Sequence, residues 1–534
     1  MPGLAVFASQ FPVPLFAHRM VASLANASDI REGGHMAAQK ARVKIDLDRA
    51  TGPIDRRIFG GFIEHLGRCI YGGIHDEGSP LSDSQGFRTD VLEALRPLRM
   101  PLLRWPGGNF VSGYTWTDGI GPVDKRPRRL ELAWHDVESN RFGTDEYIAY
   151  CRELGTEPFI CVNMGTGTME EARSWVEYCN GTEDTYWANL RRENGHAEPY
   201  NVRYWALGNE MYGNWQIGAL SAEDYVKKAI EFAKVMLWTD PSIELISCGH
   251  TGSAAWDRTV LEGLAKFVRY HSIHIYTGSA DYAENVYQPH LAEWELDNMR
   301  TEIDRVRAQQ GIEHEIGVAF DEWNVWYRAR GAATRLEERY DLSDALAVAA
   351  YLNIFIRQSD VVKIANLAQM VNVIAPIFTS PDGLFLQTIY HPLRLLAEHT
   401  QDVALSAWVD GPRVTLPSTP PGQEQPSRAA RLGEFDVLDV AASRSEGRDV
   451  LVVSLINRHE HDALEVTLEL DGAGASGVAR RFDVIGEDVH AINDFDNPDA
   501  ASVREGTFEA EGSRLSLSLA PHSHTVLRLA TSPA

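Results

Sequence analysis

Residues 201–250 read NVRYWALGNEMYGNWQIGALSAEDYVKKAIEFAKVMLWTDPSIELISCGH and contain one complete strand–helix–strand unit. Residues 203–210 form an apolar run with large side chains, which is typical of a buried strand. A serine then opens residues 221–240, where apolar residues recur at helical spacing. A second apolar run follows at 244–250. This order predicts two parallel strands joined by a crossover helix.

The same alternation of strand and helix continues on both sides of this unit. Eight strand-then-helix steps can be counted over residues 56–385. The expected strands lie in RIFGGFIEHLG, LLRWPGGN, PFICVNMG, RYWALGNE, ELISCGH, SIHIYTG, IGVAFDEWNV and VKIANLAQMVNV. Eight such steps are the pattern of a (β/α)8 TIM barrel, an α/β fold, so residues 56–385 are predicted to be a barrel domain.

The sequence pattern changes after the barrel. Residues 386–534 show two-residue alternation of apolar and polar side chains, frequent turn residues and no convincing helix. They are predicted to form an antiparallel, jelly-roll-like β-sandwich domain. Residues 36–55 contain the strand ARVKIDLD, which is expected to join that sandwich. Residues 1–35 are apolar in part but broken by prolines, and they are interpreted as a disordered extension or a start-codon artefact.

Charge and cysteine content narrow the class of protein. The chain carries 50 Lys and Arg against 75 Asp and Glu, a formal charge of −25. Such a surface repels phosphate backbones and anionic lipids, so neither nucleic acid nor membrane is an expected partner. The five cysteines lack metal-ligand spacing and no HExxH motif occurs. We therefore expect no cofactor, and a reducing, cytoplasmic location.

Polar side chains gather where the predicted barrel strands end. In barrels of this kind the carboxyl ends of the strands build the active site. The candidate residues there are Glu64, Arg104, Asn109, Asn209, Glu210, His274, Tyr276, Glu322 and Gln369. Tryptophans are interleaved with them and there is no basic cluster, which favours a neutral sugar as ligand. His274 is expected to bond a carboxylate or the sugar.

Two carboxylates, Glu210 and Glu322, end the fourth and seventh predicted strands. These strands face each other across a barrel mouth, so the two side chains can converge. Paired carboxylates are the machinery of glycoside hydrolysis, in which one protonates the leaving oxygen and the other attacks or activates water. Asn209 is placed to bond a sugar 2-hydroxyl. Asp321 is the alternative acid beside Glu322, but strict alternation along the strand would turn it away from the pocket.

Four longer motifs point to a family. GGFIEHLGRCIYGGI, LRWPGGNFVSGYTW, WALGNEMYGNWQIG and FDEWNVWY occur in that order. They resemble the α-L-arabinofuranosidases of glycoside hydrolase family 51, and the resemblance extends over residues 41–534. It implies Glu210 as acid/base and Glu322 as nucleophile of a retaining, exo-acting enzyme that removes terminal arabinofuranosyl groups from arabinan, arabinoxylan and their oligosaccharides.

The same resemblance implies the surroundings of the sugar and the assembly. Residues expected around the arabinofuranose are Glu64, Arg104, Asn109, Asn209, Tyr276 and Gln369. Trp134 and Trp326 are expected near the leaving-group side. The family also implies an accessory sandwich that includes the first strand, and an intracellular homo-oligomer, commonly a hexamer.

Two other functions remain open from the sequence. An endoglucanase or a β-xylosidase can use the same scaffold, although bulky loop elements such as Trp134 favour a closed exo pocket. A noncatalytic carbohydrate-binding protein would keep the aromatic residues but would have no need of both Glu210 and Glu322.

Overall fold

The computed structural model describes residues 39–329, 334–420 and 425–533. The predicted extension at residues 1–35 lies outside these ranges. Among the described residues, none of the helices combines the length and apolarity that a bilayer crossing requires.

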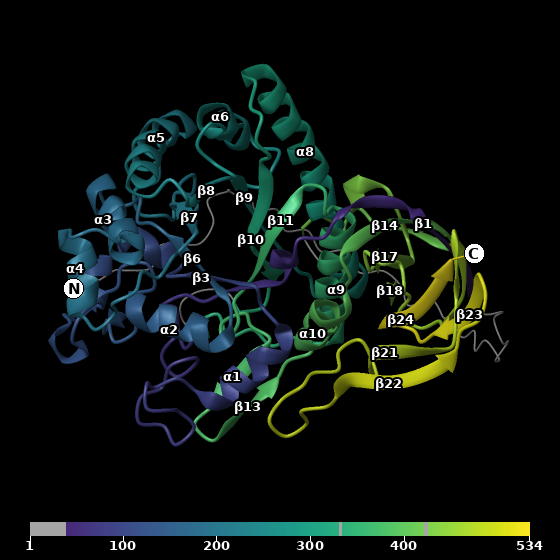
Figure 1. Ribbon diagram of the computed structural model, residues 1–534. Helices are drawn as coiled ribbons and strands as arrows, with labels where there is room; N and C mark the ends of the chain where they lie inside the picture. The colour runs from purple at the N-terminus through teal and green to yellow at the C-terminus, as the bar shows by residue number, and fades with distance from the viewer. Residues whose placement is uncertain (1–38, 330–333, 421–424, 534) are drawn as a thin grey trace, which may run out of the picture. The chain divides into compact units, whose positions relative to one another are not determined.

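The central unit is a closed barrel of eight parallel strands, in the order β10-β11-β2-β3-β6-β7-β8-β9 (Figure 1). Its strands are β2 (Gly60–Phe62), β3 (Leu102–Trp105), β6 (Glu157–Cys161), β7 (Tyr204–Leu207), β8 (Glu244–Ser247), β9 (Tyr270–Thr277), β10 (Gly317–Val325) and β11 (Val362–Ala368). The strands follow one another around the barrel in chain order, so the predicted (β/α)8 barrel is confirmed.

Helices lie between successive strands, and several begin with the side-chain caps that the sequence provides. Ser221 accepts a hydrogen bond from the backbone of Asp224 at the start of α5, as predicted. The helices are α1 (Thr89–Leu95), α2 (Thr144–Leu154), α3 (Met169–Asn180), α4 (Tyr186–Glu193), α5 (Ala222–Thr239), α6 (Ala255–Leu264), α7 (Tyr282–Tyr287), α8 (His290–Gln310), α9 (Leu342–Arg357) and α10 (Tyr390–His399).

The barrel strands are apolar on both faces, for two different reasons. One set of side chains, which includes Phe159, Ala206 and Ile246, forms a cluster inside the barrel. The alternate side chains, such as Trp205 and Leu207, belong to the larger core shared with the helices. Because the interior is filled by apolar residues, polar groups can gather at the carboxyl ends of the strands.

Strand β10 has a local bulge between Ala319 and Trp323, where it contains one more residue than the facing stretch of each neighbour. Against β9, Ala319 pairs with Ser272 and Glu322 pairs with His274, so three steps on β10 match two on β9. Against β11, Phe320 and Trp323 show the same mismatch. A bulge of this kind interrupts the alternation of side chains along a strand.

The C-terminal domain is mostly sheet, and the first strand of the described chain belongs to it. The sheet follows the order β22-β21-β24-β18-β17-β14-β1-β19-β23, with β20 attached to β24. Its strands are β1 (Gln39–Pro53), β14 (Val403–Asp410), β17 (Leu438–Arg444), β18 (Val450–Asn457), β19 (Leu464–Asp471), β20 (Ala473–Ala475), β21 (Val478–Gly486), β22 (Ala501–Glu509), β23 (Arg514–Leu519) and β24 (Ser523–Pro533).

Three two-stranded sheets complete the described strands. They are β4 (Arg129–Leu130) with β5 (Val137–Glu138), β12 (Ile377–Ser380) with β13 (Gly383–Leu386), and β15 (Arg413–Thr415) with β16 (Glu434–Asp436).

Two details of the C-terminal half differ from expectation. The sheet is not wholly antiparallel, because β1 pairs antiparallel with β14 but parallel with β19. The chain after residue 385 also contains a helix, α10, whose buried face includes Leu393 and Leu396. A helix of 10 residues between two strand-like stretches leaves only a short periodic signal, which explains why it was missed.

Helix α9 packs against the sheet domain as well as against the barrel. Asn353 donates a hydrogen bond of 2.6 Å to Asp439 on β17, and Arg357 pairs with the same carboxylate at 3.1 Å. On the barrel side, Phe320 and Trp323 of β10 contact Phe355. The strand that carries Glu322 is therefore braced by a helix that is itself fixed to the sheet.

Alternation along β1 offers a direct test of its place in the sheet domain. Ile45 is fully buried, whereas its neighbour Lys44 is exposed. Ile45→Ala should lower the free energy of unfolding by about 2–5 kcal/mol, since it leaves a cavity in a packed core. Lys44→Ala should change it by less than about 0.5 kcal/mol. Urea unfolding monitored by circular dichroism measures both, and equal effects would contradict the register of β1.

Candidate active site

Glu210 and Glu322 meet at the mouth of the barrel. Glu210 lies three residues beyond the end of β7, and Glu322 lies on β10. One oxygen of each carboxylate and a ring nitrogen of His274 all lie within 4.8 Å of one another. The convergence predicted from the sequence therefore occurs, although 112 residues separate the two glutamates in the chain.

Glu322 is held by one cation and one hydroxyl. The Arg104 guanidinium donates to Oε1 at 2.7 Å, and the Tyr276 hydroxyl donates to Oε2 at 2.9 Å. Arg104 is almost fully buried and also donates to Asn209 Oδ1 at 2.6 Å. Burial lowers the pKa of Arg104, but the nearby Asp321 and Glu322 carboxylates outweigh it and raise that pKa. The guanidinium thus stays charged and fixes the orientation of Glu322.

Glu210 has a different set of partners. Its Oε1 lies 3.0 Å from His274 Nδ1 and accepts from the Tyr212 hydroxyl at 3.2 Å. Its Oε2 accepts from the indole of Trp215 at 2.7 Å. Burial disfavours the charged form, but the hydrogen bond and positive charge of His274 lower the pKa of Glu210 below its usual range. The two glutamates, although close together, therefore occupy distinct electrostatic environments.

His274 links Glu210 to a third carboxylate, that of Asp321. Its Nε2 lies 3.1 Å from Asp321 Oδ1. Burial alone would lower the pKa of His274, but the Glu322 and Asp321 carboxylates raise it to about 10. The neighbouring His271 instead contacts Asp257 on α6, so the two histidines lie on opposite faces of β9.

The prediction that Asp321 points away from the pocket is wrong. Asp321 is buried beside His274, accepts from the Ser272 hydroxyl, and lies 3.4 Å from Arg104 Nε. The bulge in β10 turns Asp321 and Glu322 to the same side, while Phe320 faces the helices. The pKa of Asp321 is lowered despite burial, because Arg104 and His274 favour its charge. Asp321 thus belongs to the site through these partners.

Glu64 and Gln369 form a second group at the mouth. The Gln369 amide donates to Glu64 Oε2 at 3.0 Å, and the Glu64 backbone donates back to Gln369 Oε1. The indole of Trp134, in the loop between β4 and β5, donates to Glu64 Oε1 at 3.1 Å. Burial raises the pKa of Glu64 to about 7, with a contribution from the charge of Glu322. The loop that carries Trp134 is thereby drawn over Glu64.

Gly108 marks the space between these groups. A methyl group at this position would lie 3.1 Å from Glu322 Oε1, 3.4 Å from Asn209 Nδ2 and 3.5 Å from Glu64 Oε2. Glycine keeps this space open for a ligand atom. Asn209 is buried, and its Nδ2 has no acceptor among the described residues. An unpaired buried donor beside the nucleophile candidate is a position where a ligand oxygen would be bound.

The remaining predicted residues lie at the edge of the site. Trp326 packs edge-on against Tyr276, with ring centroids 5.5 Å apart. Asn109 opens a short 3-10 turn after β3 and takes no part in the hydrogen bonds above. Sequence reasoning missed Tyr212 and Trp215 as partners of Glu210. The aromatic turn MYGNW directly after Glu210 was the available signal.

The cluster of Glu210, His274 and Glu322 also has the spacing of a metal site. Arg104 already neutralises Glu322 at 2.7 Å, and His274 has a raised pKa that favours its protonated form. Two positive charges in contact with the same carboxylates oppose the binding of a further cation. The donor set therefore fits acid/base chemistry better than metal binding.

A (β/α)8 barrel with two carboxylates converging from its fourth and seventh strands defines a class of protein, the glycoside hydrolases. Comparison with known proteins identifies the family. Residues 94–293 match the family described as "Alpha-L-arabinofuranosidase 1 domain", and residues 321–523 match "Alpha-L-arabinofuranosidase C-terminal domain".

Relatives and solved structures cover nearly the whole chain. Alpha-L-arabinofuranosidase C of Emericella nidulans is 43% identical over 91% of this chain and 97% of its own. Intracellular exo-alpha-(1->5)-L-arabinofuranosidase 1 of Bacillus subtilis is 36% identical over 92% of this chain and 99% of its own. The arabinose complex of the Thermotoga maritima alpha-L-arabinofuranosidase superposes with a TM-score of 0.85 at 41% identity, covering 92% and 100%. The chain belongs to the α-L-arabinofuranosidases of glycoside hydrolase family 51.

The raised pKa of Glu64 has a consequence for stability that can be measured. Its folded-state pKa of about 7 exceeds the usual 4.5, so the stabilisation from a protonated Glu64 is present at low pH and is lost as pH rises toward 7. Glu64→Gln removes this dependence. Relative to the wild type, the variant should gain roughly 3 kcal/mol between pH 5 and pH 8. Urea unfolding at both pH values tests this, and a pH-independent difference would contradict a raised pKa.

Proposed function

We propose that the chain is a retaining, exo-acting α-L-arabinofuranosidase with Glu322 as nucleophile and Glu210 as acid/base. The observation that carries this proposal is the approach of the two carboxylates, with oxygens within 4.8 Å. Retaining glycosidases have carboxyl groups about 5–5.5 Å apart, whereas inverting enzymes need about 6.5–9.5 Å to admit a water. The close approach of these oxygens favours the retaining arrangement.

In the first step of the proposed reaction, Glu322 attacks the anomeric carbon of the arabinofuranosyl group. The bond from that carbon to the leaving oxygen breaks, and Glu210 donates a proton to that oxygen. In the second step, Glu210 takes a proton from water, whose oxygen attacks the same carbon and releases the Glu322 carboxylate. Arg104 and Tyr276 hold both oxygens of Glu322 and so aim it during both steps.

The proton needed by Glu210 is supplied within the site. Glu210 has a lowered pKa and His274 a raised one, so the pair holds one proton, which resides mainly on His274. Transfer across the 3.0 Å hydrogen bond gives a protonated Glu210 and a neutral His274. Once Glu322 has become an ester, it carries no negative charge and no longer stabilises the protonated form of His274. Glu210 is then the base that the second step requires.

The other site residues fit a small neutral sugar. The unpaired Nδ2 of Asn209 is placed to bond the 2-hydroxyl, and Glu64 with Gln369 offers paired acceptors and donors on the opposite wall. Trp134 over Glu64 and Trp326 beside Tyr276 narrow the entrance. A mouth narrowed in this way suits removal of terminal residues. The proposed substrates are therefore arabinan, arabinoxylan and arabino-oligosaccharides, consistent with the names of the relatives.

The alternatives from the sequence are not favoured. The glucanase-xylanase and xyloglucanase structures that resemble this chain are 13% and 12% identical, so they share the fold alone. A noncatalytic binding protein does not account for two ionisable carboxylates held in different environments.

We further propose a cytoplasmic, homo-oligomeric enzyme. All five cysteines are buried free thiols, which suits a reducing compartment, and the Bacillus subtilis relative is named intracellular. The oligomer, and the hexamer in particular, stays a prediction from the family resemblance.

Removal of each glutamate should give a different kinetic signature. Glu322→Ala should lower kcat on an aryl α-L-arabinofuranoside by roughly 1,000-fold or more, because no covalent intermediate can form. Azide should rescue it by direct attack and give a β-configured arabinosyl azide, identified by NMR. Glu210→Ala is the matched control: its first step should be spared on substrates with good leaving groups, and its azide product should be α-configured. Wild-type activity in Glu322→Ala would eliminate the proposed nucleophile.

A further inference from the structure

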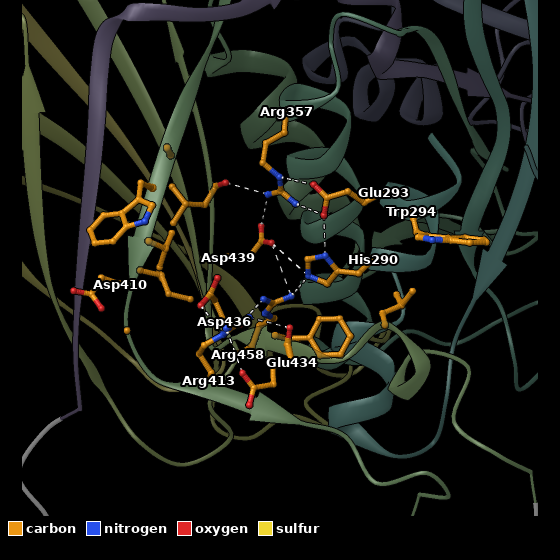
Figure 2. A pocket seen from close by; sticks show the side chains of 18 of the residues that line it. His290, Glu293, Trp294, Arg357, Asp410, Arg413, Glu434, Asp436, Asp439 and Arg458 are labelled. Atoms are coloured by element: carbon orange, nitrogen blue, oxygen red, sulfur yellow. Dashed lines mark hydrogen bonds and ion pairs between the residues drawn. The ribbon is translucent and has the colours of Figure 1, made fainter. Parts of the chain in front are cut away.

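Strands β14 and β17 of the sheet domain separate over part of their length. They pair at residues 403–405 with 442–444, and the chain pairs again where β15 meets β16. In between, residues 406–411 have no strand partner on the β17 side within the described chain. The strand edges open into a cleft of about 820 Å³, which α8 and α9 line from the other side (Figure 2). Backbone donors and acceptors therefore face a solvent-filled space.

The floor of this cleft is a rigid, internally paired network. Arg357 pairs with Glu293 at 2.9 Å and with Asp439 at 3.1 Å, and His290 bridges Glu293 and Arg458 at 2.9 and 2.7 Å (Figure 2). Each charge on the floor has a partner of opposite sign or a hydrogen bond. Because the side chains are already fixed, a ligand would lose little free energy in ordering them.

The charge of the lining selects against ionic ligands. Six carboxylates and three arginines line the cleft. The excess of negative charge repels anions, and the arginines that pair with the carboxylates satisfy the sites that a cation would use. A neutral ligand rich in hydroxyl groups fits a lining in which arginines offer hydrogen-bond donors and carboxylates offer acceptors.

Two exposed tryptophans stand on the walls of the cleft. Trp294 of α8 is 41% exposed, and Trp408 of β14 is 52% exposed. An arginine lies over each ring, Arg431 over Trp294 and Arg42 over Trp408, at 5.2 and 5.0 Å from the ring centroids. Exposed tryptophans are costly to solvate and present flat apolar faces, which are suited to the C–H faces of sugar rings.

A short piece of chain connects this cleft to the catalytic site. Arg428 donates at 3.0 Å to the backbone carbonyl of Tyr276, the residue whose hydroxyl holds Glu322. Three residues later, Arg431 lies over Trp294 at the cleft wall. Three residues span at most about 11 Å between Cα atoms. One short segment of the chain therefore links the backbone of Tyr276 to the wall of the cleft.

We propose that this cleft is a second carbohydrate-binding site, which holds a remote part of a neutral polysaccharide while its terminal arabinofuranosyl group is hydrolysed. Trp294 and Trp408 are the stacking residues, and the open edge of β14 with the paired floor supplies hydrogen bonds to hydroxyl groups. The proposal rests on the arabinofuranosidase function proposed above and extends it to how a polymeric substrate is held.

The test compares Trp294→Ala and Trp408→Ala with a control variant, Trp238→Ala. Trp238 is 79% exposed on α5 and does not line the cleft. On soluble arabinan or arabinoxylan, the two cleft variants should show a KM at least about fivefold higher than the wild type. On an aryl α-L-arabinofuranoside, which fills only the catalytic pocket, all three should match the wild type. The Trp238→Ala variant should match it on both substrates.

A second measurement does not depend on turnover. In a Glu322→Gln background, native gels containing the same polysaccharide should retard the parent and Trp238→Ala more than either cleft variant. Equal retardation of all variants would overturn the proposal. A changed sedimentation coefficient for the cleft variants with unchanged retardation would also overturn it, because the cleft would then be a contact between copies of the chain.

These readouts separate the new site from the proposed function. If the wild type fails to hydrolyse the aryl arabinofuranoside, the proposed function fails, while the retardation assay still reports on the cleft. If the aryl substrate is hydrolysed and polysaccharide kinetics are unaffected in both cleft variants, the second site alone is contradicted.

Discussion

The buried guanidinium of Arg104 is the interaction on which the site depends. It sits on β3 and joins Asn209, which follows β7, to Glu322 on β10, with Asp321 at 3.4 Å. One side chain thus connects three parts of the barrel mouth that are distant in the sequence. Removing one partner of such a buried pair typically costs about 3–5 kcal/mol, because a charge is left uncompensated. The same geometry that stabilises the mouth also fixes the direction in which Glu322 faces the pocket.

The bulge in β10 brings a third carboxylate, that of Asp321, into this arrangement. Because Asp321 and Glu322 face the same side, His274 can lie between Asp321 and Glu210 and bear a proton in an otherwise apolar interior. Arg104 and protonated His274 together balance the two negative charges of Asp321 and Glu322. In an unbulged strand, Asp321 would face Tyr351 and Phe355 on α9, where Phe320 and Trp323 lie. The position of Asp321 beside His274 thus depends on a local bulge in β10.

The sequence predicted the barrel, the two converging glutamates and the polar residues at the strand ends, because hydrophobic periodicity and the position of strand termini are local signals. It could not predict on which face of β10 Asp321 lies, because a bulge depends on how β10 pairs with β9 and β11. The parallel pairing of β1 with β19 was hidden for the same reason, since partners lie some 425 residues apart. The hydrogen bonds from Tyr212 and Trp215 to Glu210 depend on the backbone path of the turn that follows Glu210. The sequence shows only that this turn is rich in aromatic residues.

The configuration of the first product tests the central claim most directly, since it reports whether Glu322 forms a covalent intermediate. Hydrolysis of an aryl α-L-arabinofuranoside followed by proton NMR shows which anomer of arabinofuranose appears before mutarotation. Two carboxylates with oxygens within 4.8 Å predict that the α-anomer forms first and the β-anomer appears later. Initial release of the β-anomer would contradict the double-displacement mechanism and the roles of both glutamates.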